Sequence, residues 1–218
     1  MLPTNDLKEK LSHVLWIGGA TDAGKSTIAR LLAERYRLQV YHYDRHDLRH
    51  HQRLAQSKQM YRAFLEASLE ERCAVPEPHQ LFQRALRTSQ DRLTLVIEDL
   101  LALPAVKIIL AEGFGLLPAL IAPLLSSPHQ AIWLVPAESF KRASMKRRNK
   151  TSFAAETSDP QRATDNLFRR DLLLGKLVRR QARERGLTLL KVDGSACATE
   201  VASAVERHFA PCLSRAQK

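Results

Sequence analysis

The chain has 218 residues, a formal net charge of +11 and three cysteines. This length suits a single α/β domain, residues 1–218, with an inserted or appended helical piece. No segment approaches the ~20 consecutive apolar residues of a membrane span, and the first dozen residues carry no long apolar stretch, so we expect a soluble cytoplasmic protein that makes no membrane contact. Cys73, Cys197 and Cys212 form no CxxC pair, which argues against a disulfide framework and a structural zinc site.

The positive charge is concentrated in one segment. Residues 141–185 contain 14 Lys or Arg against 5 Asp or Glu, a net charge of +9. Such a segment can attract polyphosphate, a phosphorylated substrate or nucleic acid, and composition alone does not choose among them.

The first predicted elements are an apolar strand at residues 14–17 and a helix over residues 24–36, joined by a glycine-rich segment. Residues 19–26 read Gly-Ala-Thr-Asp-Ala-Gly-Lys-Ser, the spacing of a phosphate-binding P-loop. Two glycines let the backbone wrap around phosphates, and the loop opens the positive end of the helix. We therefore predict that a nucleoside triphosphate is bound by Gly19, Ala20, Thr21, Asp22, Ala23, Gly24, Lys25, Ser26 and Thr27. The alternative is a glycine-rich turn that carries an ordinary surface lysine.

Two of these residues have specific expected roles. Lys25 is expected to reach the β- and γ-phosphates and to act in catalysis, and Ser26 is expected to bind Mg²⁺.

A second short strand is predicted at residues 38–43, and a polar, helix-favouring region follows it over residues 45–103. Pro76 and Pro78 mark a break between two helical stretches of this region. The apolar run at residues 93–97 fits a strand or a helix, and the helical spacing of the residues after it favours the helix.

The rest of the chain alternates between strands and helices. The predicted elements are strands at 106–111, 131–135 and 187–192, helices from 136 to about 148, from 165 to 185 and from 195 to about 209, and a loop at 149–164. This alternation predicts a parallel sheet with helices on both faces and with ligands at the carboxyl ends of the strands.

Three acidic residues follow predicted strands at that edge: Asp44, Glu112 and Asp193. Phosphoryl transfer needs Mg²⁺ and a group that orients or deprotonates the acceptor hydroxyl. We expect Asp44 to be that base or orienting group, although it could instead be a turn residue or a helix N-cap. Glu112 is expected to contact Mg²⁺ or, with Gly113, the acceptor; the alternative is a surface loop acid. Asp47 is interpreted as a first-turn helix residue that could share the metal site.

Arginines flank the predicted loop at residues 149–164, as expected for a lid that closes over ATP and excludes water. They are Arg142, Arg147 and Arg148 before the loop and Arg169 and Arg170 after it. Arg147 and Arg148 are expected to act in catalysis and Arg170 in acceptor binding; the alternative for each is a solvated helix face.

The acceptor pocket is expected within residues 45–103. Arg45, Arg49, Arg53, Tyr61 and Arg62 indicate a polar or anionic ligand, and Arg49 is the predicted substrate contact.

Four histidines cluster early in that region. We interpret His42, His46, His50 and His51 as solvated or structural residues, or as a contact to the acceptor, because their spacing does not place them on one helical face and no cysteine is near.

In the order of its parts, the chain resembles the P-loop small-molecule kinases, which include nucleoside, nucleotide, shikimate and gluconate kinases and the chloramphenicol and zeta-toxin-type phosphotransferases. The resemblance rests on residues 19–27, Asp44, the Glu112-Gly113 pair, the arginine-flanked loop and the Val192-Asp193-Gly194 turn. It implies a three-layer P-loop NTPase fold with a five-stranded parallel sheet in the order 2-3-1-4-5, ATP and Mg²⁺ as cofactors, acceptor binding by residues 45–103 and a lid at 149–164. It also implies that Gly194 and Ser195 lie beside the adenine.

Two departures qualify the resemblance. Asp22 places an acid inside the phosphate loop, which is unexpected unless it faces solvent or a metal. The Asp-Gly-x-Pro-Arg run of nucleotide kinases is absent after the third strand, which weakens the case for a nucleoside monophosphate acceptor.

The sequence therefore predicts an ATP-dependent kinase that phosphorylates a hydroxyl or a phosphate of a small metabolite. The alternative hypothesis is a nucleotide-binding regulator or a nucleic-acid-associated ATPase that uses the basic segment 141–185. That segment contains only Phe153 and Phe168 as aromatic residues, which favours the kinase because surfaces that bind nucleic acid usually add aromatic side chains for stacking.

Overall fold

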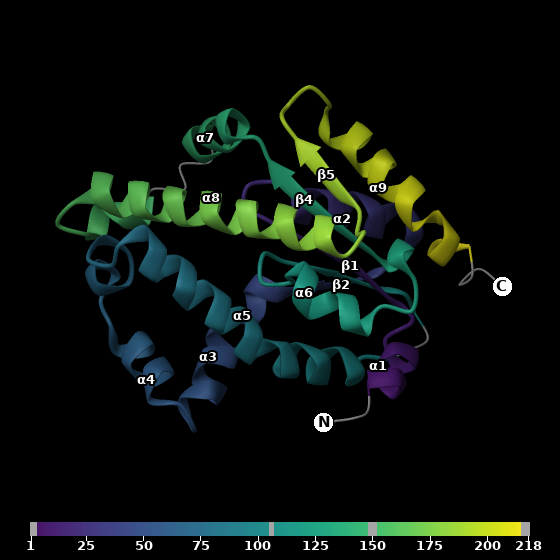
Figure 1. Ribbon diagram of the computed structural model, residues 1–218, viewed down its shortest axis with the longest axis horizontal. Coiled ribbons are helices and arrows are strands. Elements are labelled where there is room, and N and C mark those ends of the chain that lie inside the picture. Colours follow the sequence, from purple (N-terminus) through teal and green to yellow (C-terminus); the bar gives the residue numbers. More distant parts are fainter. Residues whose placement is uncertain (1–3, 105–106, 148–151, 215–218) are drawn as a thin grey trace.

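Five parallel strands form the centre of the protein in a computed structural model that describes residues 4–104, 107–147 and 152–214 (Figure 1). The strands are β1 (Val14–Gly19), β2 (Gln39–His42), β3 (Ile109–Glu112), β4 (Ala131–Pro136) and β5 (Leu189–Val192). Their order across the sheet is β2-β3-β1-β4-β5, which confirms the predicted α/β fold and strand order.

The central strand β1 is enclosed on every side. It pairs with β3, where Val14 is opposite Ile109, and with β4, where Trp16 is opposite Ala131. All residues of β1, β3 and β4 are buried, which explains their nearly continuous apolar sequences, because a parallel strand covered on both faces has no solvated side.

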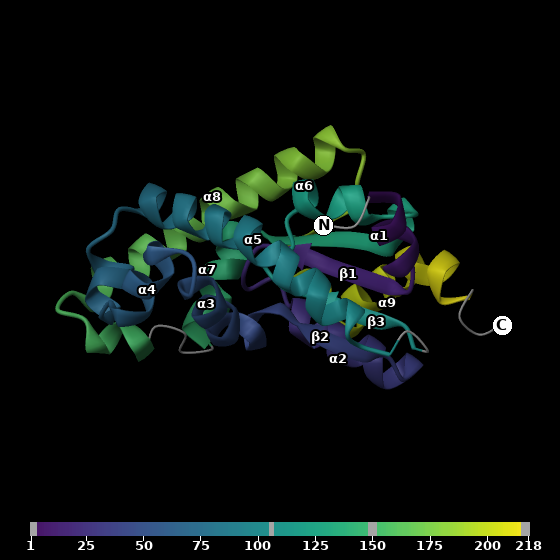
Figure 2. The ribbon, with the colours of Figure 1, turned by 90° about the horizontal axis from the view of Figure 1, so that it is seen from below.

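Helices cover both faces of the sheet (Figures 1 and 2). One face carries α1 (Thr4–Lys10), α5 (Pro78–Leu101), α6 (Pro118–Ile121) and α8 (Pro160–Glu184), and the other carries α2 (Lys25–Tyr36) and α9 (Ala198–Leu213). Alternate residues of β1 pack into two hydrophobic clusters, one on each face of the sheet. Trp16 packs with the first set of helices, and Leu15 and Ile17 pack with α2 and α9. The side chains of β1 thus contribute to the hydrophobic clusters on both faces of the sheet.

The region between β2 and β3 is helical, as predicted. It contains a 3₁₀ turn (Tyr43–His46), α3 (Asp47–Ala55), α4 (Gln59–Glu66), a π-helical turn (Glu70–Ala74) and α5. Residues 93–97 lie inside α5, so the helical prediction for this run is confirmed. Pro78 occupies the first turn of α5, and Glu77 with Gln80 forms a capping box there, which fixes the start of the helix.

Several predicted boundaries are wrong. α8 begins at Pro160 rather than at residue 165, because Asp159 caps the backbone N–H of Arg162 and proline suits the first helical position. The segment predicted as a loop at 149–164 therefore contains a 3₁₀ turn (Ser152–Glu156) and the first turn of α8, while residues 148–151 lie outside the described residues. β3 begins at Ile109, and residue 106, where this strand was predicted to start, lies outside the described residues. α7 spans Glu138–Arg147, and the short helices α1 and α6 were not predicted.

Within the described parts of the chain, none of the helices combines the length and the apolar character needed to cross a lipid bilayer.

Candidate functional site

The glycine-rich segment after β1 adopts the backbone of a tight loop. Gly19, Asp22 and Gly24 have positive φ angles of 116°, 65° and 82°. A Cβ atom on Gly19 would lie 2.0 Å from the carbonyl oxygen of Leu134, so no larger residue fits there. Asp22 is of a type that tolerates this backbone region, and Gly24 is the N-cap of α2.

A pocket of about 110 Å³ lies at this loop. It is lined by Thr21, Asp22, Gly24, Lys25, Ser26, Thr27, Asp44 and Glu112. Lys25 is buried, and its Nζ atom donates a hydrogen bond to the carbonyl oxygen of Ala20 at 2.8 Å. The structure thus brings the P-loop together with both acids expected from the ends of β2 and β3.

Glu112 is a buried carboxylate at the centre of this pocket. Its Oε1 atom accepts a hydrogen bond from Ser26 Oγ at 3.0 Å and lies 2.7 Å from Nδ1 of His42. Its Oε2 atom is buried and has no hydrogen-bond partner. The interpretation of Glu112 as a surface loop acid is therefore wrong.

Ser26 and Glu112 are the residues of this pocket that could hold a hard cation such as Mg²⁺. Buried carboxylate oxygens normally have hydrogen-bond partners, and the unpartnered Oε2 atom of Glu112 lies in a side chain that already bonds Ser26. No group of three or more His, Cys, Asp and Glu side chains in the described ranges could enclose a metal alone. Mg²⁺ at triphosphate sites needs no such group, because one or two protein ligands, phosphate oxygens and waters complete its shell.

Asp44 lies on the rim of the phosphate pocket. More than a third of the residue is exposed, yet the protein around the carboxyl group removes enough water to raise its pKa, and the charge of Lys25 opposes this shift. The side chain does not begin a helix: the N-cap of α3 is His46, without a side-chain capping bond. The N-cap alternative for Asp44 is therefore wrong, but Asp44 does lie in a turn, the 3₁₀ turn Tyr43–His46. Asp47 is the first residue of α3, as interpreted.

A second pocket, of about 360 Å³, shares Asp44 with the first. It is lined by Asp44, Asp47, His51, Phe64, Arg72, Cys73, Leu81, Arg84, Ala85, Thr88, Phe114, Leu167 and Arg170. These residues come mainly from α3, α4, the π-helical turn, α5 and α8. The pocket lies largely in the predicted acceptor region, but the arginines that line it are Arg72, Arg84 and Arg170, of which only Arg170 was predicted from the sequence.

The structure also contains a buried charge network that the sequence did not indicate. Nζ of Lys141 on α7 lies 2.8 Å from Oδ2 of Asp22 and 2.7 Å from Oδ2 of Asp171 on α8. Thr21 Oγ1 donates to the same Asp171 oxygen at 2.5 Å. Burial alone would raise the pKa of Asp171, but the charges of Arg170 and Lys141 hold it below its usual value. Asp22 therefore faces a lysine, and neither of the two expected surroundings, solvent or a metal, describes it.

Other predicted site residues lie elsewhere. Arg49 is exposed and donates to Asp99 at 2.6 Å, so it lines neither pocket. Arg147 is exposed at the end of α7 and also lines neither pocket, whereas Arg148 lies outside the described residues. Gly113 packs against Tyr43, where a Cβ atom would lie 2.3 Å from that of the tyrosine.

The turn after β5 occupies the same sheet edge as the P-loop. Ser195 donates both its N–H and its hydroxyl to Asp193, and a Cβ atom on Gly194 would lie 2.9 Å from the ring of Phe140 on α7. The turn is exposed and continues into α9.

The four histidines have different main partners, and the rings of His46 and His50 also stack on each other at 5.9 Å. His42 bonds Glu112, His46 stacks on Tyr41, and His50 is buried between Asp99 and Arg92. His51 stacks on Phe64 at a ring separation of 4.9 Å and lines the second pocket. Burial lowers the pKa of His50, which favours the neutral ring.

Comparison with known proteins leaves the function open. No protein-family model matches the chain, and no curated protein matches it. Among solved structures, the chain is similar to an uncharacterized protein from Eubacterium ventriosum, with 13% sequence identity and a TM-score of 0.46 over 91% of this chain and 98% of that one.

Proposed function

We propose that the protein is an ATP- and Mg²⁺-dependent kinase that transfers the γ-phosphoryl group to a small molecule. The observation that carries this proposal is the position of Asp44, which lines both the P-loop pocket and the larger pocket beside it. A carboxylate at the junction of a phosphate pocket and a second pocket is placed to act on an acceptor next to the transferring group.

The residues of the phosphate pocket have distinct roles in this proposal. Lys25 binds the β- and γ-phosphates, the backbone of residues 19–24 surrounds the phosphates, and Ser26 with Glu112 holds the metal. When bound, the metal neutralises negative charge on the phosphate oxygens. The exposed turn at Gly194 and Ser195, beside Phe140, is the proposed site of the adenine.

Asp44 orients the acceptor and takes its proton. As the acceptor oxygen bonds to the γ-phosphorus, the bond from that phosphorus to the β–γ bridging oxygen breaks, ADP leaves, and the acceptor proton passes to Asp44. The raised pKa of Asp44 suits this role, because a general base works best when its pKa lies closer to the operating pH.

The proposal is tested by measuring ADP release while small-molecule acceptors are added one at a time. An acceptor should increase the rate at least tenfold, Lys25→Ala should abolish the increase, and Asp44→Asn should remove it while ATP binding measured by calorimetry persists. Asp6→Asn, an exposed change on α1, is the matched control and should behave like the unmodified protein. Full turnover by the Lys25→Ala variant would refute the proposal.

The basic segment 141–185 gives the alternative hypothesis less support than its composition suggested. Lys141 is buried in the P-loop network, and Arg170 lines the second pocket. Steep, salt-dependent retention of the protein on an oligonucleotide column would nevertheless favour a nucleic-acid-associated ATPase over the kinase.

A further inference from the structure

Three arginines from three different elements converge on the second pocket. Arg72 comes from the π-helical turn, Arg84 from α5 and Arg170 from α8. They surround the Cys73 thiol closely enough that all three charges act on its pKa, against the larger effect of burial, which raises it. The spacing of these arginines in the sequence does not predict that they lie together. They meet because α5 and α8 pack against each other.

This cluster lacks matching negative charge. In the described part of the chain, Arg72 and Arg84 have no carboxylate within ion-pair distance. Arg170 pairs with Asp171, but that carboxylate also pairs with Lys141. Burial lowers the pKa of Arg84, and the neighbouring charges of Arg170 and Arg72 lower it further. Like charges held together in a partly buried site raise the free energy of the empty pocket, and a bound anion would remove that cost.

The guanidinium groups also retain unused hydrogen-bond donors. Arg72 donates from Nη2 to the carbonyl oxygen of Leu65 at 2.8 Å, but its Nε atom is buried without a partner. Arg84 donates from Nη2 to the carbonyl oxygen of Arg72. Each guanidinium carries five N–H donors, and these two bonds use one donor of each arginine.

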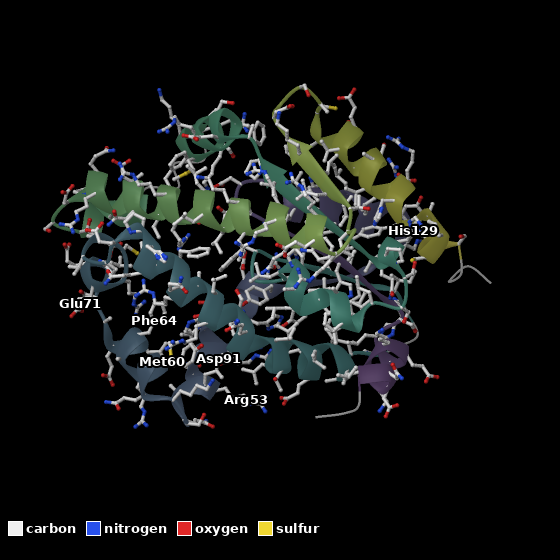
Figure 3. The ribbon with its side chains drawn as sticks, viewed as in Figure 1. Arg53, Met60, Phe64, Glu71, Asp91 and His129 are labelled. Carbon is white, nitrogen blue, oxygen red and sulfur yellow. The ribbon has the colours of Figure 1, made fainter. Side chains whose placement is uncertain are left out.

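An aromatic ring fixes two of these arginines in place. The Cζ atoms of Arg72 and Arg84 lie 4.7 Å and 5.2 Å from the ring centre of Phe64 on α4. Figure 3 shows Phe64 and Glu71 toward one end of the molecule, far from His129. Stacking on a ring holds a guanidinium in a defined plane, which preorganises it for a bidentate contact with an oxyanion.

The arginine cluster and Asp44 serve different parts of the same pocket. Asp44 also lines the first pocket, at the glycine-rich loop, whereas none of the three arginines does. A ligand that filled the pocket would therefore meet cations at one place and the Asp44 carboxylate at another.

We propose that the acceptor is a phosphomonoester that is bound through its phosphate by Arg72, Arg84 and Arg170 and that presents a separate hydroxyl group to Asp44. This inference rests on the proposed function and names its substrate class. A phosphate dianion balances three guanidinium charges better than a carboxylate does, and its oxygens match bidentate arginine contacts. The transfer is the one described above, and the phosphate of the acceptor remains intact throughout.

The binding part of this proposal is tested without turnover. The P-loop itself can bind phosphate, so inorganic phosphate is titrated by calorimetry into the full-length Lys25→Ala variant. The remaining affinity should fall at least tenfold when Arg72→Gln or Arg84→Gln is added. Arg87→Gln, an exposed change on the same helix as Arg84, is the matched control and should leave the affinity unchanged. Equal affinities in all of these variants would overturn the site.

A second measurement uses the unmodified chain, so it does not depend on the folding of any variant. Cys73 lines the arginine cluster, whereas Cys197 is exposed on the turn before α9. Inorganic phosphate should slow maleimide labelling of Cys73 at least threefold while labelling of Cys197 is unchanged, as measured by peptide mass spectrometry. Unchanged labelling of Cys73 at saturating phosphate would also overturn the site.

The substrate class is then tested by comparing phosphorylated molecules with their dephosphorylated forms as acceptors. Sugar phosphates and phosphorylated hydroxy acids should stimulate ADP release at least tenfold more than the matched sugars and hydroxy acids. Stimulation only by the dephosphorylated forms, or a product with a new phosphoanhydride bond, would overturn the assignment. Phosphate binding at the arginines without turnover of any acceptor would instead refute the kinase proposal and support the anion site.

Discussion

Lys141 and Asp22 form a buried ion pair at 2.8 Å that ties the phosphate loop to helix α7. The same lysine pairs with Asp171 at 2.7 Å, so the loop is also tied to α8. These helices border the segment that was predicted to be a lid. A movement of either helix would therefore displace the backbone that is proposed to hold the triphosphate.

Replacing this lysine should destabilise the fold strongly. Lys141→Met keeps the volume of the side chain but removes the countercharge of two buried carboxylates, and we expect a loss of ~3–5 kcal/mol in the free energy of unfolding. Urea denaturation measures this loss. Lys146→Met, an exposed change on the same helix, should stay within ~0.5 kcal/mol of the unmodified protein. A similar stability for both variants would contradict a structural role for the ion pair.

Asp44→Asn should raise the stability of the protein at neutral pH. The folded state holds the pKa of Asp44 above its usual value of 3.8, so ionisation of Asp44 favours the unfolded chain once the pH exceeds that value. The substitution removes this cost. The increase in Tm should be present at pH 7 and should disappear as the pH falls below 3.8.

A matched substitution should have the opposite sign. The hydroxyl and N–H of Ser195 hold the pKa of the exposed Asp193 at about 2, so ionised Asp193 favours the folded state above pH 3.8 and loses this effect as the pH falls toward 2. Asp193→Asn should therefore lower Tm slightly at pH 7. If both substitutions shift Tm in the same direction in thermal scans, the raised pKa of Asp44 is contradicted.

Glu112→Gln should uncouple magnesium from nucleotide binding. The amide keeps the shape of the side chain and its contact with Ser26 but is a much weaker ligand for a hard cation. Calorimetry should show that Mg²⁺ strengthens ATP binding to the unmodified protein and that this gain falls at least tenfold in the variant, whereas binding without metal changes little. Glu138→Gln, an exposed change on α7, is the control. If Glu138→Gln loses the Mg²⁺-dependent gain in ATP affinity as much as Glu112→Gln does, the metal is not held at Glu112.

Gly115→Ala should destabilise the corner between β3 and α6. A Cβ atom at this position would lie 2.2 Å from Cζ and 2.3 Å from Oη of the buried Tyr43, so the backbone or the ring must move, at a cost of ~1–3 kcal/mol. Gly186→Asn is the contrasting change, because its φ of 61° suits asparagine and the position is open. Chemical denaturation should show a clear loss for the first variant and little for the second.

The fold and the tight turn of the glycine-rich loop were predictable from local sequence signals. The glycines of the loop have a fixed spacing, and the buried strands have the nearly continuous apolar sequences expected of a parallel sheet covered on both faces. The start of α8 was also marked by Asp159 and Pro160, although we assigned these residues to a loop.

The charged residues inside the site were not predictable in the same way. Lys141, Arg72 and Arg84 have the sequence surroundings of exposed helical cations. Lys141 is buried and the two arginines are half-buried only because of the way the helices pack together. Asp22 was a clue, because an acid in a phosphate loop needs a partner, but nothing in the sequence selects Lys141 among the 14 cations of its segment. Arg49, the predicted substrate contact, pairs with Asp99, fifty residues away, and this pairing could not be read from the sequence.

The long sequence separation of the Lys141 contacts bears on how the chain folds during translation. Asp22 lies 119 residues before Lys141, and Thr21 lies 150 residues before Asp171. A ribosome-bound chain that ends before residue 141 cannot form these contacts, even though the whole glycine-rich loop has already been synthesised. The proposed nucleotide site should therefore be completed late in synthesis, after α8 has left the exit tunnel.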